Sequence, residues 1–405
     1  LGIGVRWASV ILFSFLCYAG FAGTQAPTQN ILPTFLWVGL WVGLAYFAAL
    51  VANIWPAVNP YLAIYDGFVV LFRRNKAPAG TLRYPAGLGA WPAVAGLLAV
   101  AWLELVAAGG ERPALLAAGM LAYAAFCLIG MALFGREWLA RGDVFTVAFA
   151  VLGRFAPFGT RRPDDRDPPG RWVLRWPGAG LLLQRPLSFP MTVFVLVMLS
   201  NVTFDGFLET PLWNHILDTV ATSQALRPWL LDIQSAGVNL LGLLKTAGLV
   251  AFPLLFLASY AGVCVLVSIA GGRAVDGWTL ARWFVLTLVP IAIAYHLAHY
   301  ASFFALAGQL MIPLASDPLG RGWDLFGTAH VHVDPSVISA RFVWFTSVGT
   351  IVAGHVIAVL LAHLQTHRVI RDPRAATLSQ LPMLALMIGY TMTSLWILSQ
   401  PVVKA

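Results

Sequence analysis

The chain has 405 residues, of which 59% are hydrophobic and only 10% are charged. Soluble domains carry about a quarter charged residues, so this composition, with a mean hydropathy of +0.79, excludes a large-cored soluble enzyme and predicts a protein embedded in the lipid bilayer. The net charge of +8 comes without a dense Lys/Arg patch on a polar fold, and we expect no nucleic-acid partner.

Apolar runs of roughly 20 residues predict membrane-spanning helices. We therefore expect an all-α integral membrane protein, a bundle of about nine transmembrane helices in a single transmembrane domain covering residues 1–405. We interpret the first run as a span rather than a signal peptide, because no clear small-residue cleavage site follows it. The predicted spans are 5–23, 31–55, 86–108, 113–135, 187–207, 238–270, 280–312, 338–367 and 378–402.

Three segments between the spans have their own character. Residues 59–72 and 143–155 are apolar but too short to cross, and each precedes a basic stretch, so both are predicted as interfacial helices. Residues 160–185 are rich in Pro, Gly, Asp and Arg and are predicted as a cytoplasmic linker.

Basic residues concentrate in the loops after the second, fourth, sixth and eighth spans. The opposite loops carry only Arg112, Arg227, Arg321 and Arg341. The positive-inside rule then predicts a bacterial inner (cytoplasmic) membrane protein with a cytoplasmic N-terminus and a periplasmic C-terminus.

Histidines inside the seventh and eighth spans are the main candidates for chemistry. Ionisable side chains within a span are costly and usually mark a functional site. At about 1.5 Å rise per residue, His296, His299 and His355 come out near the middle of the bilayer, whereas His363 lies near its cytoplasmic surface. His296 and His299 share a helix face, and His355 lies on the next span.

These histidines allow two cofactor sites. In one, His296 or His299 pairs with His355 across a b-type haem, one ligand from each of two facing helices. In the other, His296, His299 and His355 bind a single zinc, iron or copper ion with an open position for water. A structural alternative also stands, in which neutral imidazoles form hydrogen bonds inside the bundle.

A second polar group is predicted toward the outer side. Asp205 and Glu209 close the fifth span, Glu104 lies near the outer end of the third, and Lys245 lies about two turns into the sixth. Asp205 and Lys245 are predicted to form a charge pair. If a bound metal activates water, Asp205 or Glu209 is the candidate catalytic base.

Five segments together resemble one family. They are NIWPAVNP (53–60), VTFDGF (202–207), SDPLGRGWDLFG (316–327), GHVIAV (354–359) and GYTM (389–392). On these segments the chain, from about the second span to its end, is similar to the bacterial polytopic membrane proteins known as fenitrothion hydrolases. This resemblance implies cleavage of an organophosphorus ester, and it carries no motif of catalytic residues onto this chain.

Three function classes remain open from the sequence. The first is a membrane protein with a histidine-lined metal or haem site, as a hydrolase or an electron-transfer subunit. The second is a transporter or a proton- or ion-conducting protein, which Pro253 and Pro290 support because they interrupt the sixth and seventh spans. The third is a structural or assembly subunit with other membrane or periplasmic subunits as partners.

Overall fold

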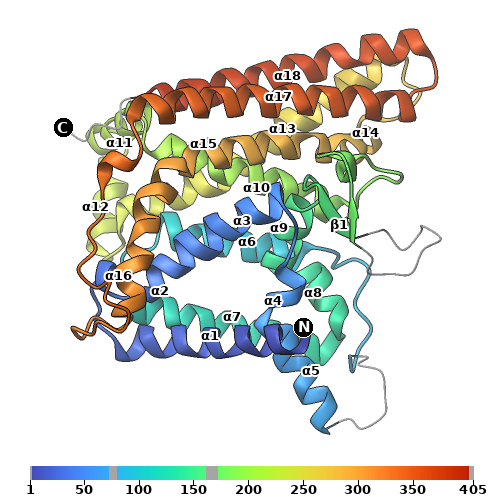
Figure 1. The fold of residues 1–405 in the computed structure, drawn as a ribbon. Coiled ribbons are helices and arrows are strands. Elements are labelled where there is room, and N and C mark those ends of the chain that lie inside the picture. Colours follow the sequence, from blue (N-terminus) through green and yellow to red (C-terminus); the bar gives the residue numbers. More distant parts are fainter. Residues whose placement is uncertain (1, 73–79, 161–171, 401–405) are drawn as a thin grey trace. The chain divides into compact units, whose positions relative to one another are not determined.

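A computed structural model describes residues 2–72, 80–160 and 172–400, which are mostly helical (Figure 1). Their contacts group into two compact units. Unit 1 consists of residues 1–96, 109–180 and 300–343, and unit 2 of residues 97–108, 181–299 and 344–405. Each unit therefore joins segments that are far apart in the sequence.

The described residues contain eight helical segments that are long and apolar enough to cross a membrane. These segments are compatible with an all-α membrane protein, and large apolar side chains on them, such as Ile11 and Val356, are exposed as a bilayer requires. The segments are Gly4–Ala22, Ile31–Leu50, Pro113–Phe134, Phe189–Leu208, Leu240–Ala270, Gly277–Ser316, Ala340–Val369 and Pro373–Ser399.

The third predicted span, 86–108, is shorter in the structure. Its helix, α6, covers Trp91–Leu105, which is 15 residues. Pro85, Gly87 and Gly89 form a turn where the apolar run begins, and Gly89 has a φ of 47°. The turn delays the helix start because a left-handed residue cannot continue a right-handed helix.

Unit 1 contains the N-terminal helices and residues 300–343. Its second candidate span includes a π-helical stretch, Phe35–Leu44, in which the two halves of LWVGLWVG repeat each other. The α-helices of unit 1 are α1 Gly2–Ala22, α2 Ile31–Thr34, α3 Ala45–Leu50, α4 Trp55–Val58, α5 Pro60–Phe72, α7 Pro113–Phe134, α8 Arg136–Gly142, α9 Val144–Leu152 and α16 Met311–Ser316. Short 3-10 helices cover Pro27–Gln29, Ala179–Leu181, Gly308–Leu310 and Pro335–Val337.

Unit 2 contains the helices that carry the predicted site. Its loop after α10 folds into two short helices that the sequence did not suggest. The helices are α10 Phe189–Leu208, α11 Pro211–Thr222, α12 Arg227–Ser235, α13 Leu240–Ala270, α14 Gly277–Phe284, the 3-10 turn Val285–Leu288 and α18 Pro373–Ser399. Helices α6, α15 (Val289–Ala307) and α17 (Ala340–Val369) contribute residues to both units.

The two proline interruptions differ. Helix α13 continues through Pro253. The seventh predicted span is broken instead, because α14 ends at Phe284, a 3-10 turn follows, and Pro290 lies in the first turn of α15. A proline is tolerated there because its missing N–H would lack a partner in the helix anyway.

The two predicted interfacial helices both form, as α5 and α9. Helix α5 is buried at its start and exposed from Phe68 to Leu71. Helix α9 is buried on nearly all sides against α3, α4 and α8. The prediction that 143–155 lies with one face in the membrane surface is therefore wrong, because its apolar side chains, such as Phe145 and Phe149, form part of the core of unit 1.

The predicted linker, 160–185, is described only in part, since residues 161–171 lie outside the described ranges. The flanking strands β1, Phe158–Thr160, and β2, Trp172–Leu174, pair antiparallel.

A fully buried carboxylate organises the core of unit 1. Asp143, the N-cap of α9, is 0% exposed. Its oxygens accept hydrogen bonds from the hydroxyls of Tyr123 and Thr146, from Trp55 Nε1 at 3.4 Å, and from Asn59 Nδ2 at 3.4 Å. The backbone N–H groups at the start of α9 donate as well. Burial raises the pKa of Asp143, and the hydrogen bonds from Thr146, Tyr123 and Trp55 oppose that effect.

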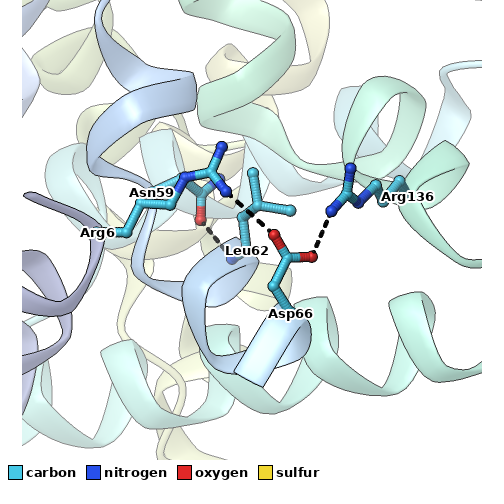
Figure 2. Close-up of polar contacts among 5 residues, drawn as sticks. All are labelled: Arg6, Asn59, Leu62, Asp66 and Arg136. Carbon is cyan, nitrogen blue, oxygen red and sulfur yellow. Dashed lines mark hydrogen bonds and ion pairs between the residues drawn. The ribbon is translucent and has the colours of Figure 1, made fainter. Parts of the chain in front are cut away.

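Asn59 connects this carboxylate to α5. Its Oδ1 accepts from the backbone N–H groups of Tyr61 and Leu62, which caps α5 (Figure 2), while its Nδ2 donates to Asp143. The helix starts of α5 and α9 are thereby joined by one side-chain hydrogen bond.

Replacing Asp143 by alanine is expected to destabilise the protein strongly. The substitution leaves the hydroxyl donors of Tyr123 and Thr146 without their acceptor, and each such loss costs about 1–3 kcal/mol. The midpoint of thermal unfolding in detergent measures the effect. Glu137→Gln is the control, since the ion pair of Glu137 with Arg141 is exposed on both sides and its loss should change stability by less than about 0.5 kcal/mol. Equal midpoints for the two variants would contradict this role of Asp143.

Candidate functional site

Helix α10 brings an acidic residue into unit 2. Most of its side chains from Thr192 to Gly206 are buried, and Phe204 packs against Leu249 of α13 and Ala101 of α6. Asp205 is next to Phe204 near the C-terminal end of the helix, so it lies on the neighbouring face. A polar residue, Asn201, lies one turn earlier on the face of Asp205.

Asp205 meets a histidine of α15. Its Oδ2 lies 2.8 Å from Nε2 of His299, and the two side chains are 20% and 18% exposed. The contact joins two candidate spans and brings a carboxylate and an imidazole within hydrogen-bond distance away from bulk water. With Asp205 ionised, the ring nitrogen of His299 is the donor in this contact.

Two further polar side chains of α15 surround this pair. Tyr295 lies one turn before His299, and the two rings are stacked with centroids 5.9 Å apart and an interplanar angle of 7°. Asp205 lies close enough to interact electrostatically with both Tyr295 and His296. We call Asp205, Tyr295, His296 and His299 the Asp205 cluster.

Buried polar atoms with no hydrogen-bond partner among the described residues lie on α10, α15 and α17. Among the described residues, no group bonds to the Tyr295 hydroxyl, to either side-chain polar atom of Asn201, or to Nε2 of His355. Nδ1 of His355 lies 2.8 Å from the Ile351 carbonyl oxygen, so the neutral ring presents Nε2 as an acceptor. Buried polar groups usually have partners, so these atoms mark places for water or a polar ligand.

Glycines allow the three helices to approach closely. A Cβ on Gly354 of α17 would lie 2.3 Å from the Ala294 Cβ of α15, and a Cβ on Gly206 of α10 would lie 2.3 Å from the Tyr295 hydroxyl oxygen. Ser347 also donates to the Ala298 carbonyl oxygen at 3.2 Å. Helices α15 and α17 are thus in direct contact, the arrangement that the sequence suggested for spans seven and eight.

The predicted acidic group is only partly assembled. Asp205 bonds to His299, and Nζ of Lys245 instead donates to the Leu105 carbonyl oxygen at the end of α6, 3.0 Å away. The predicted Asp205–Lys245 pair is therefore wrong. Lys245 caps the C-terminus of a helix, where a cation is favoured. Glu209, the other candidate base, is exposed at the C-cap of α10.

The predicted metal site does not form from these residues. Among the described residues, no three His, Cys, Asp or Glu side chains converge closely enough to hold a metal ion. His299 binds Asp205, while Nδ1 of His355 bonds to its own helix. The set His296, His299 and His355 thus does not fit a bound zinc, iron or copper ion, because its members make separate contacts.

A b-type haem between His296 and His355 does not fit either. The Nε2 atoms of both rings are buried. Helices α15 and α17 touch at Ala294 and Gly354, beside the two proposed ligands. A macrocycle with an axial imidazole on each side needs the two helices to stand well apart, and at this level they are in van der Waals contact.

Comparisons with known proteins add no assignment. No family model, no curated protein and no solved structure matches the chain. The resemblance to the fenitrothion hydrolases therefore rests on the sequence segments alone.

Sequence reasoning missed the parts that Tyr295 and Asn201 play. Both were visible as polar residues within spans, and each lies four residues before a member of the Asp205–His299 pair. That spacing places them on the same helix faces as the pair, and it is the signal that could have found them.

Alanine at Gly354 is expected to destabilise the contact between α15 and α17. The new methyl group would overlap Ala294, and overpacking of this kind costs about 1–3 kcal/mol. Gly349→Ala on the same helix is a matched control, since a Cβ there meets nothing within 4 Å and alanine is the better helix former. Thermal unfolding midpoints in detergent should fall for Gly354→Ala only. A fall of the same size in both variants would contradict the close approach.

Proposed function

We propose that this chain is a membrane protein that transfers protons through the Asp205 cluster, as a proton-conducting protein or a proton-coupled transporter. The observation that carries the proposal is the 2.8 Å contact between Asp205 Oδ2 and His299 Nε2 inside two candidate spans. Ionisable residues within membrane spans mark proton relays and ion pathways by default.

The pair has two protonation states that differ by one proton. In the first, Asp205 is ionised and accepts a hydrogen bond from Nε2–H of neutral His299, so the pair carries one negative charge. When a proton binds at Nδ1, the imidazolium and the carboxylate together are neutral. Both side chains are partly exposed, which gives water access to the pair.

Neighbouring polar atoms provide the next positions for a proton. The Tyr295 hydroxyl, the Asn201 amide and Nε2 of His355 are buried without hydrogen-bond partners among the described residues. Water molecules that bridge such atoms form a hydrogen-bonded chain. The stacked rings of Tyr295 and His299 place the hydroxyl beside the pair.

We also propose the topology that the arginines predict, with nine crossings of the bacterial inner membrane and a cytoplasmic N-terminus. Contacts within unit 1 support it. Arg6, Asp66 and Arg136, all predicted to be cytoplasmic, lie together, while the loop at Gln25 bonds to Ala114 on the predicted outer side. Helix α6 counts as a crossing, because otherwise the arginine-rich loop after α7 would face the outside.

Replacing either member of the pair should abolish proton flux. Asp205→Asn and His299→Gln in proteoliposomes with an internal pH-sensitive dye are expected to lower the flux driven by a pH gradient about a hundredfold, a typical contribution of one proton-transfer group. Asp205→Glu keeps the carboxyl group and should restore part of the flux.

Two variants control for general damage. Glu209→Gln changes an exposed carboxylate on the same chain segment, and His363→Gln changes an exposed histidine of α17. Both should conduct like the unmodified chain. Flux at the original rate in Asp205→Asn would refute the proposal, as would a loss in the two control variants equal to that in Asp205→Asn.

A further inference from the structure

Two arginines share one carboxylate in unit 1 (Figure 2). Arg6 Nη1 lies 3.1 Å from Asp66 Oδ2, and Arg136 Nη2 lies 2.7 Å from Asp66 Oδ1. The three residues come from α1, α5 and α8, which lie far apart in the sequence. Each oxygen of the Asp66 carboxylate therefore holds one guanidinium group, so the two guanidinium groups lie beside one another.

The group has a surplus of positive charge and of hydrogen-bond donors. Two guanidinium groups against one carboxylate leave a net charge of +1. Each guanidinium has five N–H donors and gives Asp66 one contact. The Arg6 Nε–H is buried and has no acceptor among the described residues. The side chains of Arg6 and Arg136 are 36% and 57% exposed, so their remaining donors are accessible to an anion from outside.

Large apolar side chains adjoin the arginine pair. Trp7 follows Arg6 on α1, is 47% exposed, and has its ring over Gly67 of α5. Beyond Asp66, the side chains of Phe68, Val70 and Leu71 are 56%, 78% and 72% exposed. A surface that is cationic at one point and apolar beside it matches the boundary between headgroups and acyl chains.

We propose that Arg6 and Arg136 bind the phosphate group of an anionic phospholipid, with its acyl chains along the apolar residues of α1 and α5. Arginine is suited to this role because its planar donors match phosphate oxygens in pairs. Asp66 orients both guanidinium groups before the lipid binds. Assignment of this lipid to the cytoplasmic leaflet rests on the proposed topology, whereas binding itself does not.

The apolar surroundings favour a lipid over free phosphate. A soluble anion would gain only the contacts with the guanidinium groups, which salt and water weaken at an exposed site. A phospholipid adds the burial of its acyl chains against side chains that already face away from the protein. Basic sites between helices at the membrane surface bind lipid headgroups by the same combination.

Native mass spectrometry of the detergent-purified full chain tests the site by counting bound lipids during titration. The probes are dioleoyl-phosphatidylglycerol, dioleoyl-phosphatidylcholine and inorganic phosphate as a competitor. The unmodified chain should bind dioleoyl-phosphatidylglycerol in preference to dioleoyl-phosphatidylcholine. Its affinity should fall about 5-fold in Arg136→Gln and about 25-fold in the double variant Arg6→Gln/Arg136→Gln, since each basic residue near a membrane surface contributes about 1 kcal/mol.

Arg141→Gln is the matched control. Arg141 lies on the same helix as Arg136 and is 44% exposed. Among the described residues, its one ion pair is with Glu137. Its loss should therefore change the affinity for the lipid less than about twofold. If the double variant fails to elute as a single species, Arg136→Gln alone decides. Three results would overturn the proposal: unchanged affinity in Arg136→Gln, equal binding of the two lipids, or displacement of the lipid by inorganic phosphate at equal concentration. None of them depends on proton flux.

Discussion

The cost of placing a carboxylate away from water shapes both units of this protein. A buried ionised group is tolerated only with hydrogen-bond partners or an opposite charge. Asp143 meets this condition with donors alone, from Tyr123, Thr146, Trp55 and Asn59, and is fully buried. Asp205 meets it with an imidazole and keeps partial exposure. The first arrangement is saturated and suits a structural role, while the second leaves the carboxylate and its imidazole partner partly exposed.

Close packing of helices makes the Asp205 site possible. Gly206 leaves room for the Tyr295 hydroxyl, and Gly354 lets α17 touch α15 at Ala294. Small residues at helix contacts are typical of membrane proteins, where close approach of backbones supplies the stabilisation. The same contacts bring the helices too close for a haem beside His355. The packing that holds the Asp205 cluster therefore also decides which cofactors the histidines cannot bind.

Most of the helices were predictable, because a run of apolar residues must bury its backbone polar groups in helical hydrogen bonds within a bilayer. The errors arose where local turns or tertiary contacts intervened. Residues around Gly89 shorten α6, and the buried environment of α9 comes from the core around Phe145 and Trp55. Asp205 and His299 were both singled out, but for different roles, as a candidate base and as a candidate metal or haem ligand, and their contact was not predicted. Lys245 was given the wrong partner because similar depth in a membrane does not determine which helix faces which.

By itself, the sequence determined the class of protein, the approximate ends of its spans and the polar residues that must face away from lipid. Hydrophobic length and the cost of intramembrane charge are properties of each segment alone. Only the tertiary structure decided which polar residues meet. It paired Asp205 with His299, Lys245 with the end of α6, and Asp66 with two arginines from different helices. Such pairings depend on how the helices rotate and cross, and those angles follow from side-chain packing between segments far apart in the chain.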